Sequence, residues 1–153
     1  MKPRTKARSF ALQALYEVDI TGHSGMEVLE RRFLENPVDE RLQEFARKIV
    51  SGIEPIRNEL DNFIAEHAPE WPIDQISTID RNLLRIALWE MAATDDTPVK
   101  VAINEAIELA KKFGSESTPR FVNGVLGSLA PRRNEIRQAL KSILVIADTS
   151  AEK

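Results

Sequence analysis

The chain has 153 residues, enough for one domain with a full hydrophobic core, and its 42% hydrophobic and 29% charged content is ordinary for a globular protein. It contains no cysteine, which excludes disulfides, thiolate metal sites and a cysteine nucleophile. No apolar run approaches the roughly 20 residues that span a bilayer, and the basic N-terminus lacks the apolar core of a signal peptide. We therefore expect a cytoplasmic protein that makes no contact with a membrane.

The net charge of −3 hides a strong asymmetry along the chain. Residues 1–16 hold four Lys or Arg and no acid, residues 17–97 hold 8 against 18 acids, and residues 98–153 hold 9 against 6. If the two ends meet in the fold, they form one basic face on an acidic body, which suits a polyanion such as RNA. The alternative is a solvated surface of mixed charge.

The first half of the chain shows three helical patterns. Residues 4–19 form the first, with small apolar side chains on one side and polar side chains, Gln13 among them, on the other. Residues 26–36 form a second, short helix, which ends where a proline follows. A longer pattern over residues 42–64 contains Gly52 and Pro55, and we expect a kink or break there because proline clashes with the preceding helical turn.

The second half continues with four helices. Residues 79–91 are apolar over most of the helix circumference, so this helix should be surrounded by others, with Ser77 or Thr78 as its N-cap. Two amphipathic helices follow, each introduced by a Thr-Pro pair that predicts Thr97 and Thr118 as N-caps. A last helix starts at Pro131 and directs four side chains inward: Ile136, Leu140, Ile143 and Leu144. With no strand signal and no repeat, the fold class is all-α, a compact bundle of about seven helices.

Gly124 and Gly127 fall inside the second amphipathic helix. Each costs roughly 1 kcal/mol relative to alanine in a helix interior. We expect that another backbone, or a ligand, comes close there.

No catalytic constellation is found in the sequence. His23 and His67 have no evident partner, no acidic residues show metal-ligand spacing, and no glycine loop is placed to cradle a phosphate. We therefore predict no enzyme activity, no cofactor and no metal.

Several polar residues lie beside positions predicted to be buried. Arg85, Glu90 and Glu105 are interpreted as an internal network, because buried charges must be paired. Asn104 has no clear place in this network. Phe121 is either a core residue or a stacking surface for an unpaired base, with nearby cations to hold phosphates.

Four segments carry a family pattern. They read RSFALQALYEVD, DRNLLRIALWEM, KVAINEAIELAKKFG and RFVNGVL, and they begin at Arg8, Asp80, Lys100 and Arg120. In this order they resemble the signature of the NusB family of transcription antitermination factors. The resemblance implies one domain over residues 1–153 with two packed helical subdomains, the first over about 4–66 and the second over about 73–145.

The resemblance also implies a function without catalysis. The family binds boxA, a short single-stranded element in nascent RNA, as a heterodimer with the ribosomal small-subunit protein NusE. The pair acts within the RNA polymerase antitermination complex and promotes read-through, notably in ribosomal RNA operons.

Candidate site residues follow from charge, helix position and the resemblance together. The expected RNA-binding residues are Lys2, Arg4, Lys6, Arg8, Gln13, Tyr16, Lys112, Arg120, Phe121 and Asn123. The expected residues for docking NusE are Asp80, Arg81, Leu84 and Trp89. For Leu84 and Trp89 the alternative is a place in the core, and Asn123 could instead tie two helices together.

Two other functions stay open at this point. A NusB-like domain also precedes the catalytic domain of some ribosomal RNA cytosine methyltransferases, but this chain has no methyl-donor binding region. The other alternative is a helical protein-interaction module that does not touch RNA.

Overall fold

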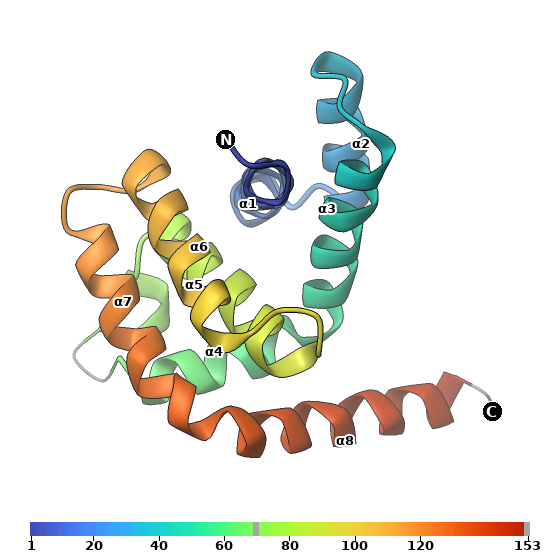
Figure 1. Cartoon of the computed structure of the whole chain (residues 1–153). Coiled ribbons are helices and arrows are strands. Elements are labelled where there is room, and N and C mark those ends of the chain that lie inside the picture. Colours follow the sequence, from blue (N-terminus) through green and yellow to red (C-terminus); the bar gives the residue numbers. More distant parts are fainter. Residues whose placement is uncertain (69–70, 152–153) are drawn as a thin grey trace.

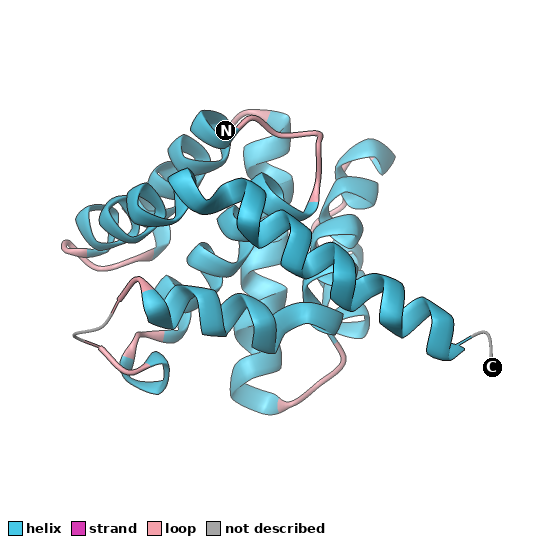
Figure 2. Ribbon diagram, turned by 90° about the horizontal axis from the view of Figure 1, so that it is seen from below, coloured by secondary structure: helices cyan, strands magenta, loops and turns pink. Residues whose placement is uncertain are grey.

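The computed structural model describes residues 1–68 and 71–151, with side chains up to Leu144 in the last helix. Within these ranges the chain contains only helices and connecting turns (Figures 1 and 2), so the all-α prediction is confirmed. The predicted single domain extends to residue 153, and its last two residues lie outside the described part. In the described part, no helix is long and apolar enough to cross a membrane.

The described residues form eight α-helices, one more than expected. In chain order they are α1 (Pro3–Thr21), α2 (Gly25–Glu35), α3 (Glu40–Ile53), α4 (Arg57–Glu66), α5 (Thr78–Leu88), α6 (Val99–Phe113), α7 (Thr118–Leu129) and α8 (Arg133–Ala151). Short helical turns lie between them: η1 (Glu54–Ile56), η2 (Ile73–Gln75), the π-helical η3 (Trp89–Ala93) and η4 (Ala130–Arg132). The extra helix arises because η1 separates α3 from α4, which confirms the break predicted near Gly52 and Pro55.

Two helices form the centre of the molecule. Helix α5 is buried from Asn82 to Leu88, as its apolar circumference predicted, and it contacts α1, α4, α6 and α7. Helix α1 contacts α2, α3, α5 and α6, and is buried over Ala7–Leu12 (Figure 1). Because α1 contacts helices from both halves of the sequence, the division into two subdomains stays a prediction.

The helix ends partly match the predicted caps. Ser77 caps α5, its side chain accepting a hydrogen bond from the Asp80 backbone N–H at 3.1 Å. Thr97 and Thr118 are not caps, and these two predictions were wrong. Thr97 is buried and donates to Glu90 Oε1 at 3.2 Å, which ties the loop before α6 to η3. Thr118 donates to Asp80 Oδ1 at 2.8 Å, which ties α7 to α5.

The two glycines of α7 do not mark a close backbone approach. A Cβ atom added to Gly124 or Gly127 would meet nothing within 4 Å among the described residues, so this expectation was wrong for protein neighbours. The close approach lies elsewhere: a Cβ added to Gly52 would come within 2.5 Å of the Trp89 ring. Gly52 therefore lets the indole pack directly on α3.

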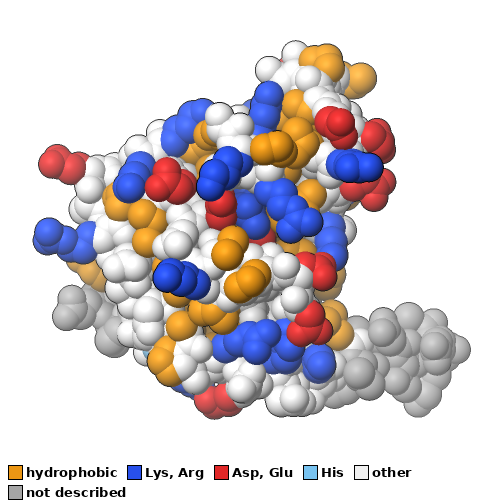
Figure 3. All heavy atoms as spheres, viewed as in Figure 1, with side chains coloured by type: hydrophobic (Ala, Val, Ile, Leu, Met, Phe, Trp, Pro, Cys, Tyr) orange, Lys and Arg blue, Asp and Glu red, His pale blue; other side chains and the backbone are white. Residues whose placement is uncertain are grey.

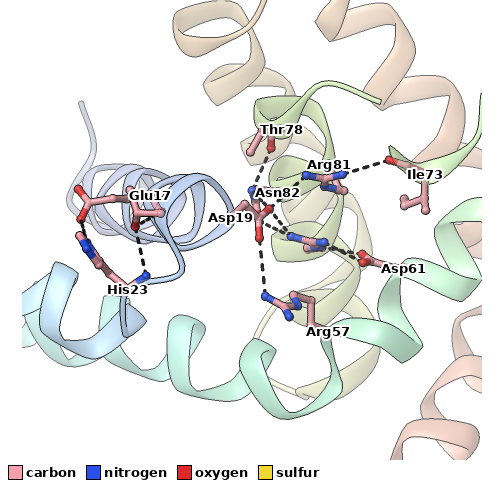
Figure 4. A network of polar contacts seen from close by, with 11 residues as sticks. Glu17, Asp19, His23, Arg57, Asp61, Ile73, Thr78, Arg81 and Asn82 are labelled. Atoms are coloured by element: carbon pink, nitrogen blue, oxygen red, sulfur yellow. Dashed lines mark hydrogen bonds and ion pairs between the residues drawn. The ribbon is translucent and has the colours of Figure 1, made fainter. Parts of the chain in front are cut away.

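A polar network joins the ends of α1, α4 and α5 (Figure 4). Asp19 accepts from Asn82 at 3.0 Å and from Arg85 at 2.7 Å, and Arg57 and Arg81 lie within 3.7 Å of its carboxylate. Burial alone would lower the pKa of Arg85, but hydrogen bonds and charge from Asp61 and Asp19 raise it. The guanidinium therefore stays charged inside the protein, and the predicted structural role of Arg85 is confirmed.

Helix α8 packs against η3 and η4 and then runs beyond the body of the molecule (Figures 1 and 2). Arg133 donates to the Met91 carbonyl at 2.8 Å, and Arg137 donates to the Thr94 carbonyl at 2.6 Å. These side chains satisfy carbonyls left open where the π-helical turn ends. Ile136 and Leu140 are buried as expected, whereas Leu144 is 37% exposed, which corrects its predicted inward position.

Candidate nucleic-acid interface

Helical geometry places the four cations at the start of α1 on two different faces of the helix. Residues two apart differ by about 200° around a helix, so they point in nearly opposite directions. Lys2 and Lys6 share one exposed face, whereas Arg4 and Arg8 turn toward α3. The four cations therefore do not act as one cluster.

Arg8 lies inside the protein, so its predicted contact with RNA phosphates is corrected. Its side chain is 3% exposed, and its guanidinium donates to both carboxylate oxygens of Glu90 at 2.8 Å. Glu105 lies 3.5 Å from the same guanidinium and accepts from Thr5 at 2.6 Å. Glu90 and Glu105 thus belong to an internal network, as predicted, and Arg8 has no exposed face for a phosphate.

Arg4 is exposed but is directed to a different side of the molecule. Its guanidinium lies 4.8 Å from the centre of the Phe45 ring. Together with Arg41 and Lys48, it borders a groove between α1 and α3. Arg4 is therefore available to an anion, although not on the face of Lys2 and Lys6.

A hollow on the other face brings the two basic ends of the chain together. We call it the basic hollow, and it is lined by Met1, Lys6, Ser9, Phe10, Gln13, Asn36 and Lys112. Lys112, from the end of α6, lies 4.0 Å from the Met1 sulfur. The expected meeting of the N-terminus with the basic C-terminal third is thus confirmed for Lys112. Figure 3 views this end of the molecule, where basic side chains gather with acidic ones among them.

Gln13 and Tyr16 continue the face of Lys6 along α1. The Gln13 side chain donates to the Ser9 carbonyl at 3.1 Å and accepts from Arg32 at 2.9 Å, so its oxygen is already engaged. Tyr16 is 40% exposed. Its ring can stack with a base, whereas Gln13 holds α2 against α1.

Arg120 and Phe121 lie in a second site, which we call the aromatic pocket. Its lining is Trp71, Gln75, Ile76, Ser77, Asp80, Ser117, Arg120 and Phe121, and it shares no residue with the basic hollow. Phe121 is partly buried against the core, while Arg120 is exposed. Asn123 is exposed on α7 and lines neither site.

The residues expected to dock NusE are mostly internal. Leu84 is fully buried and Trp89 is 6% exposed, which corrects their expected docking role and confirms the alternative that both side chains fill the core. Arg81 donates to the Ile73 carbonyl at 3.2 Å and faces Asp19, which makes it part of the internal network. Asp80 is half-buried and is the one of the four that lines the aromatic pocket.

Trp71 and Asn36 are two of the residues at these sites that the sequence did not predict. Trp71 is 53% exposed in the aromatic pocket, and Asn36 borders the basic hollow. An exposed tryptophan in a proline-containing loop was a usable signal for Trp71. Asn36 gave none, because only the packing of α2 on α1 brings it to the hollow.

In the part of the chain that the structure describes, no group of three or more His, Cys, Asp or Glu side chains could hold a metal ion. The two sites instead offer cations, exposed aromatic rings and amides. These groups bind phosphates, stack with bases and bond base edges.

The family model described as the NusB family matches residues 5–131. A relative from Dehalococcoides mccartyi (strain CBDB1), named "Transcription antitermination protein NusB", is 49% identical over 127 residues, which cover 83% of this chain and 89% of the relative. A relative of the same name from Bacillus subtilis (strain 168) is 40% identical, with 91% of this chain and 100% of the relative covered.

Solved structures show the same fold. The structure of T. maritima NusB superimposes with a TM-score of 0.79 at 32% identity, covering 87% of this chain and 94% of that one. A second structure, described as "Antitermination Factors NusB and NusE in complex with dsRNA", gives a TM-score of 0.78 at 28% identity, covering 86% and 98%.

Proposed function

The chain belongs to the NusB family of transcription antitermination proteins, and we propose that it binds single-stranded boxA RNA as a heterodimer with NusE. In this role it helps RNA polymerase read through terminators in ribosomal RNA operons. One similar structure contains NusB, NusE and RNA together, which supports the partnership.

The basic hollow is the observation that carries the proposal. Lys6 from α1 and Lys112 from α6 border one concave surface, with Lys2 close to it at the helix start. Among the described residues, none of the three forms an ion pair with a carboxylate. Unpaired cations around a hollow attract phosphates and release counterions on binding.

The aromatic pocket supplies what cations alone do not. Phosphate contacts position a strand but do not read its bases. Phe121 and Trp71 offer ring faces for an unpaired base, and Arg120 offers a charge beside them. Asp80 at the edge of this pocket is the group through which we expect NusE to dock.

The direct test is a fluorescence anisotropy titration of labelled boxA RNA with the protein, in the presence and absence of purified NusE. We expect NusE to raise the affinity for boxA RNA more than the affinity for an RNA of the same composition in scrambled order. Equal affinities for the two RNAs with NusE present would contradict the proposal, and no binding of either RNA would favour a protein-interaction module.

A variant of Asp80 tests the docking residue separately. Asp80→Asn removes the charge and keeps an oxygen that accepts from Thr118. We expect weaker NusE binding in isothermal titration calorimetry and an unchanged melting temperature. Wild-type affinity for NusE would remove Asp80 from the docking surface.

A further inference from the structure

A second groove adjoins the basic hollow, between the start of α1 and the exposed face of α6. Its volume is about 860 Å3, and Lys2 and Thr5 border it from α1. From α6 it is bordered by Asn104, Glu108 and Lys112. We call it the α1–α6 groove. Because Lys112 borders both this groove and the basic hollow, a single strand can occupy the two together.

The charges in the groove are arranged by position. Lys2 borders it from the start of α1, and Lys111 and Lys112 border it from the last turn of α6, where Lys112 lies 4.0 Å from the Met1 sulfur. The acids come from earlier turns of α6: Glu105 is held by Thr5 and Arg8, and the Glu108 carboxylate lies 3.4 Å from the Lys111 ammonium. A carboxylate repels a phosphate, so the sugar-phosphate backbone of a strand is disfavoured beside the acids and favoured on the cations.

Asn104 is the polar residue in this groove that no structural role accounts for. Its side chain is exposed, and no described residue forms a hydrogen bond with it. It lies four residues before Glu108 on α6, so both side chains project from the same face of the helix. An amide offers a donor and an acceptor together, the pattern that pairs with the edge of adenine, and a carboxylate accepts from the amino group of cytosine.

We propose that Asn104 and Glu108 read base edges of the RNA strand whose phosphates lie on Lys2 and Lys112. The inference rests on the proposed function and adds the residues that determine which bases are preferred. The bases point toward the middle turns of α6 because the acids there repel the phosphates, whereas amino groups of bases are suitable partners for these acids.

The test measures base preference rather than affinity alone. Asn104→Ala and Glu108→Gln are titrated by fluorescence anisotropy against labelled boxA RNA and against single-base variants of it, with NusE present. We expect each variant to lose discrimination at one base position, on the order of tenfold. Glu108→Gln should also bind the single-base variants more tightly than the wild type does, because it removes a repulsive charge from the groove.

Matched controls are available on exposed helix faces away from the groove. Asn58→Ala on α4 and Glu27→Gln on α2 make the same chemical changes and should keep wild-type discrimination. Thermal melting checks that all four variants fold.

The outcomes separate this inference from the function on which it rests. A wild-type protein that does not bind RNA even with NusE would overturn both. If the wild type discriminates between bases and Asn104→Ala and Glu108→Gln discriminate equally well, the inference alone is overturned. Weaker NusE binding by both variants with unchanged base discrimination would also overturn it, because the groove would then hold a protein.

Discussion

Lys6 and Arg8 show how two cations two residues apart acquire different roles. The helix turns them in nearly opposite directions, so Lys6 borders the basic hollow while Arg8 enters the core and pairs with Glu90. The sequence identified a dense basic run, but it could not show which members of the run face a buried acid 82 residues away. That distinction depends on how α1 is seated against η3.

Replacing Arg8 should therefore affect folding rather than RNA binding. Arg8→Ala leaves the Glu90 carboxylate buried without its cation, which should lower the free energy of unfolding by about 3–5 kcal/mol. Urea denaturation followed by circular dichroism measures this loss. Lys6→Ala is the matched control, with unchanged stability but weaker RNA binding. Stability equal to the wild type in Arg8→Ala would contradict the structural role given to this ion pair.

The glycines make a second prediction at the residue scale. Gly52→Ala places a methyl group where the Trp89 ring lies, and overpacking of this kind costs about 1–3 kcal/mol. Gly124→Ala meets open space within an exposed helix and should be neutral or stabilise the protein by up to about 1 kcal/mol. Thermal melting should show a lower melting temperature for Gly52→Ala and an unchanged or higher one for Gly124→Ala. A stable Gly52→Ala variant would mean that the indole is not packed as tightly as described.

At the scale of elements, helix periodicity predicted most of the architecture. The apolar circumference of residues 79–91 placed α5 at the centre, and Gly52 with Pro55 located the break between α3 and α4. The Thr-Pro pairs misled, because Thr97 and Thr118 donate their hydroxyls to acids on other elements rather than capping their own helices. Local sequence patterns report a residue's own helix, whereas these bonds depend on which helices meet.

Helix α8 gives the prediction that belongs to this scale. It follows the region matched by the family model, and its arginines bond to carbonyls at the end of η3. The double variant Arg133→Ala/Arg137→Ala loses both bonds from charged donors. Each lost bond should lower the free energy of unfolding by about 1.5–3 kcal/mol. Lys141→Ala, on the exposed face of the same helix, should have little effect in urea denaturation. Equal stability of the double variant and the control would show that α8 does not support η3.

In the whole molecule, the charge asymmetry of the sequence places basic residues from both ends of the chain at one hollow. The sequence predicted one basic face only if the two ends of the chain meet in the fold. In the structure the N-terminus meets the end of α6, where Met1 contacts Lys112. Arg120 and Phe121 were expected in one RNA site with Lys112, but they line a separate pocket with Trp71 and Asp80. Lys112 and Phe121 therefore line two separate hollows rather than one junction, because α7 begins beyond a turn at residues 114–117.

The salt dependence of RNA binding tests the central claim, that the basic hollow holds phosphates. We would titrate labelled boxA RNA with the double variant Lys6→Gln/Lys112→Gln at several salt concentrations. The control is Lys100→Gln/Lys141→Gln, which makes the same change in net charge at two exposed lysines that do not line the hollow. For single strands each phosphate contact contributes about 0.7 to the slope of log K against log salt. The account predicts that the first variant loses about 1.4 from this slope and binds more weakly, while the control matches the wild type. Equal slopes for the two variants would contradict it.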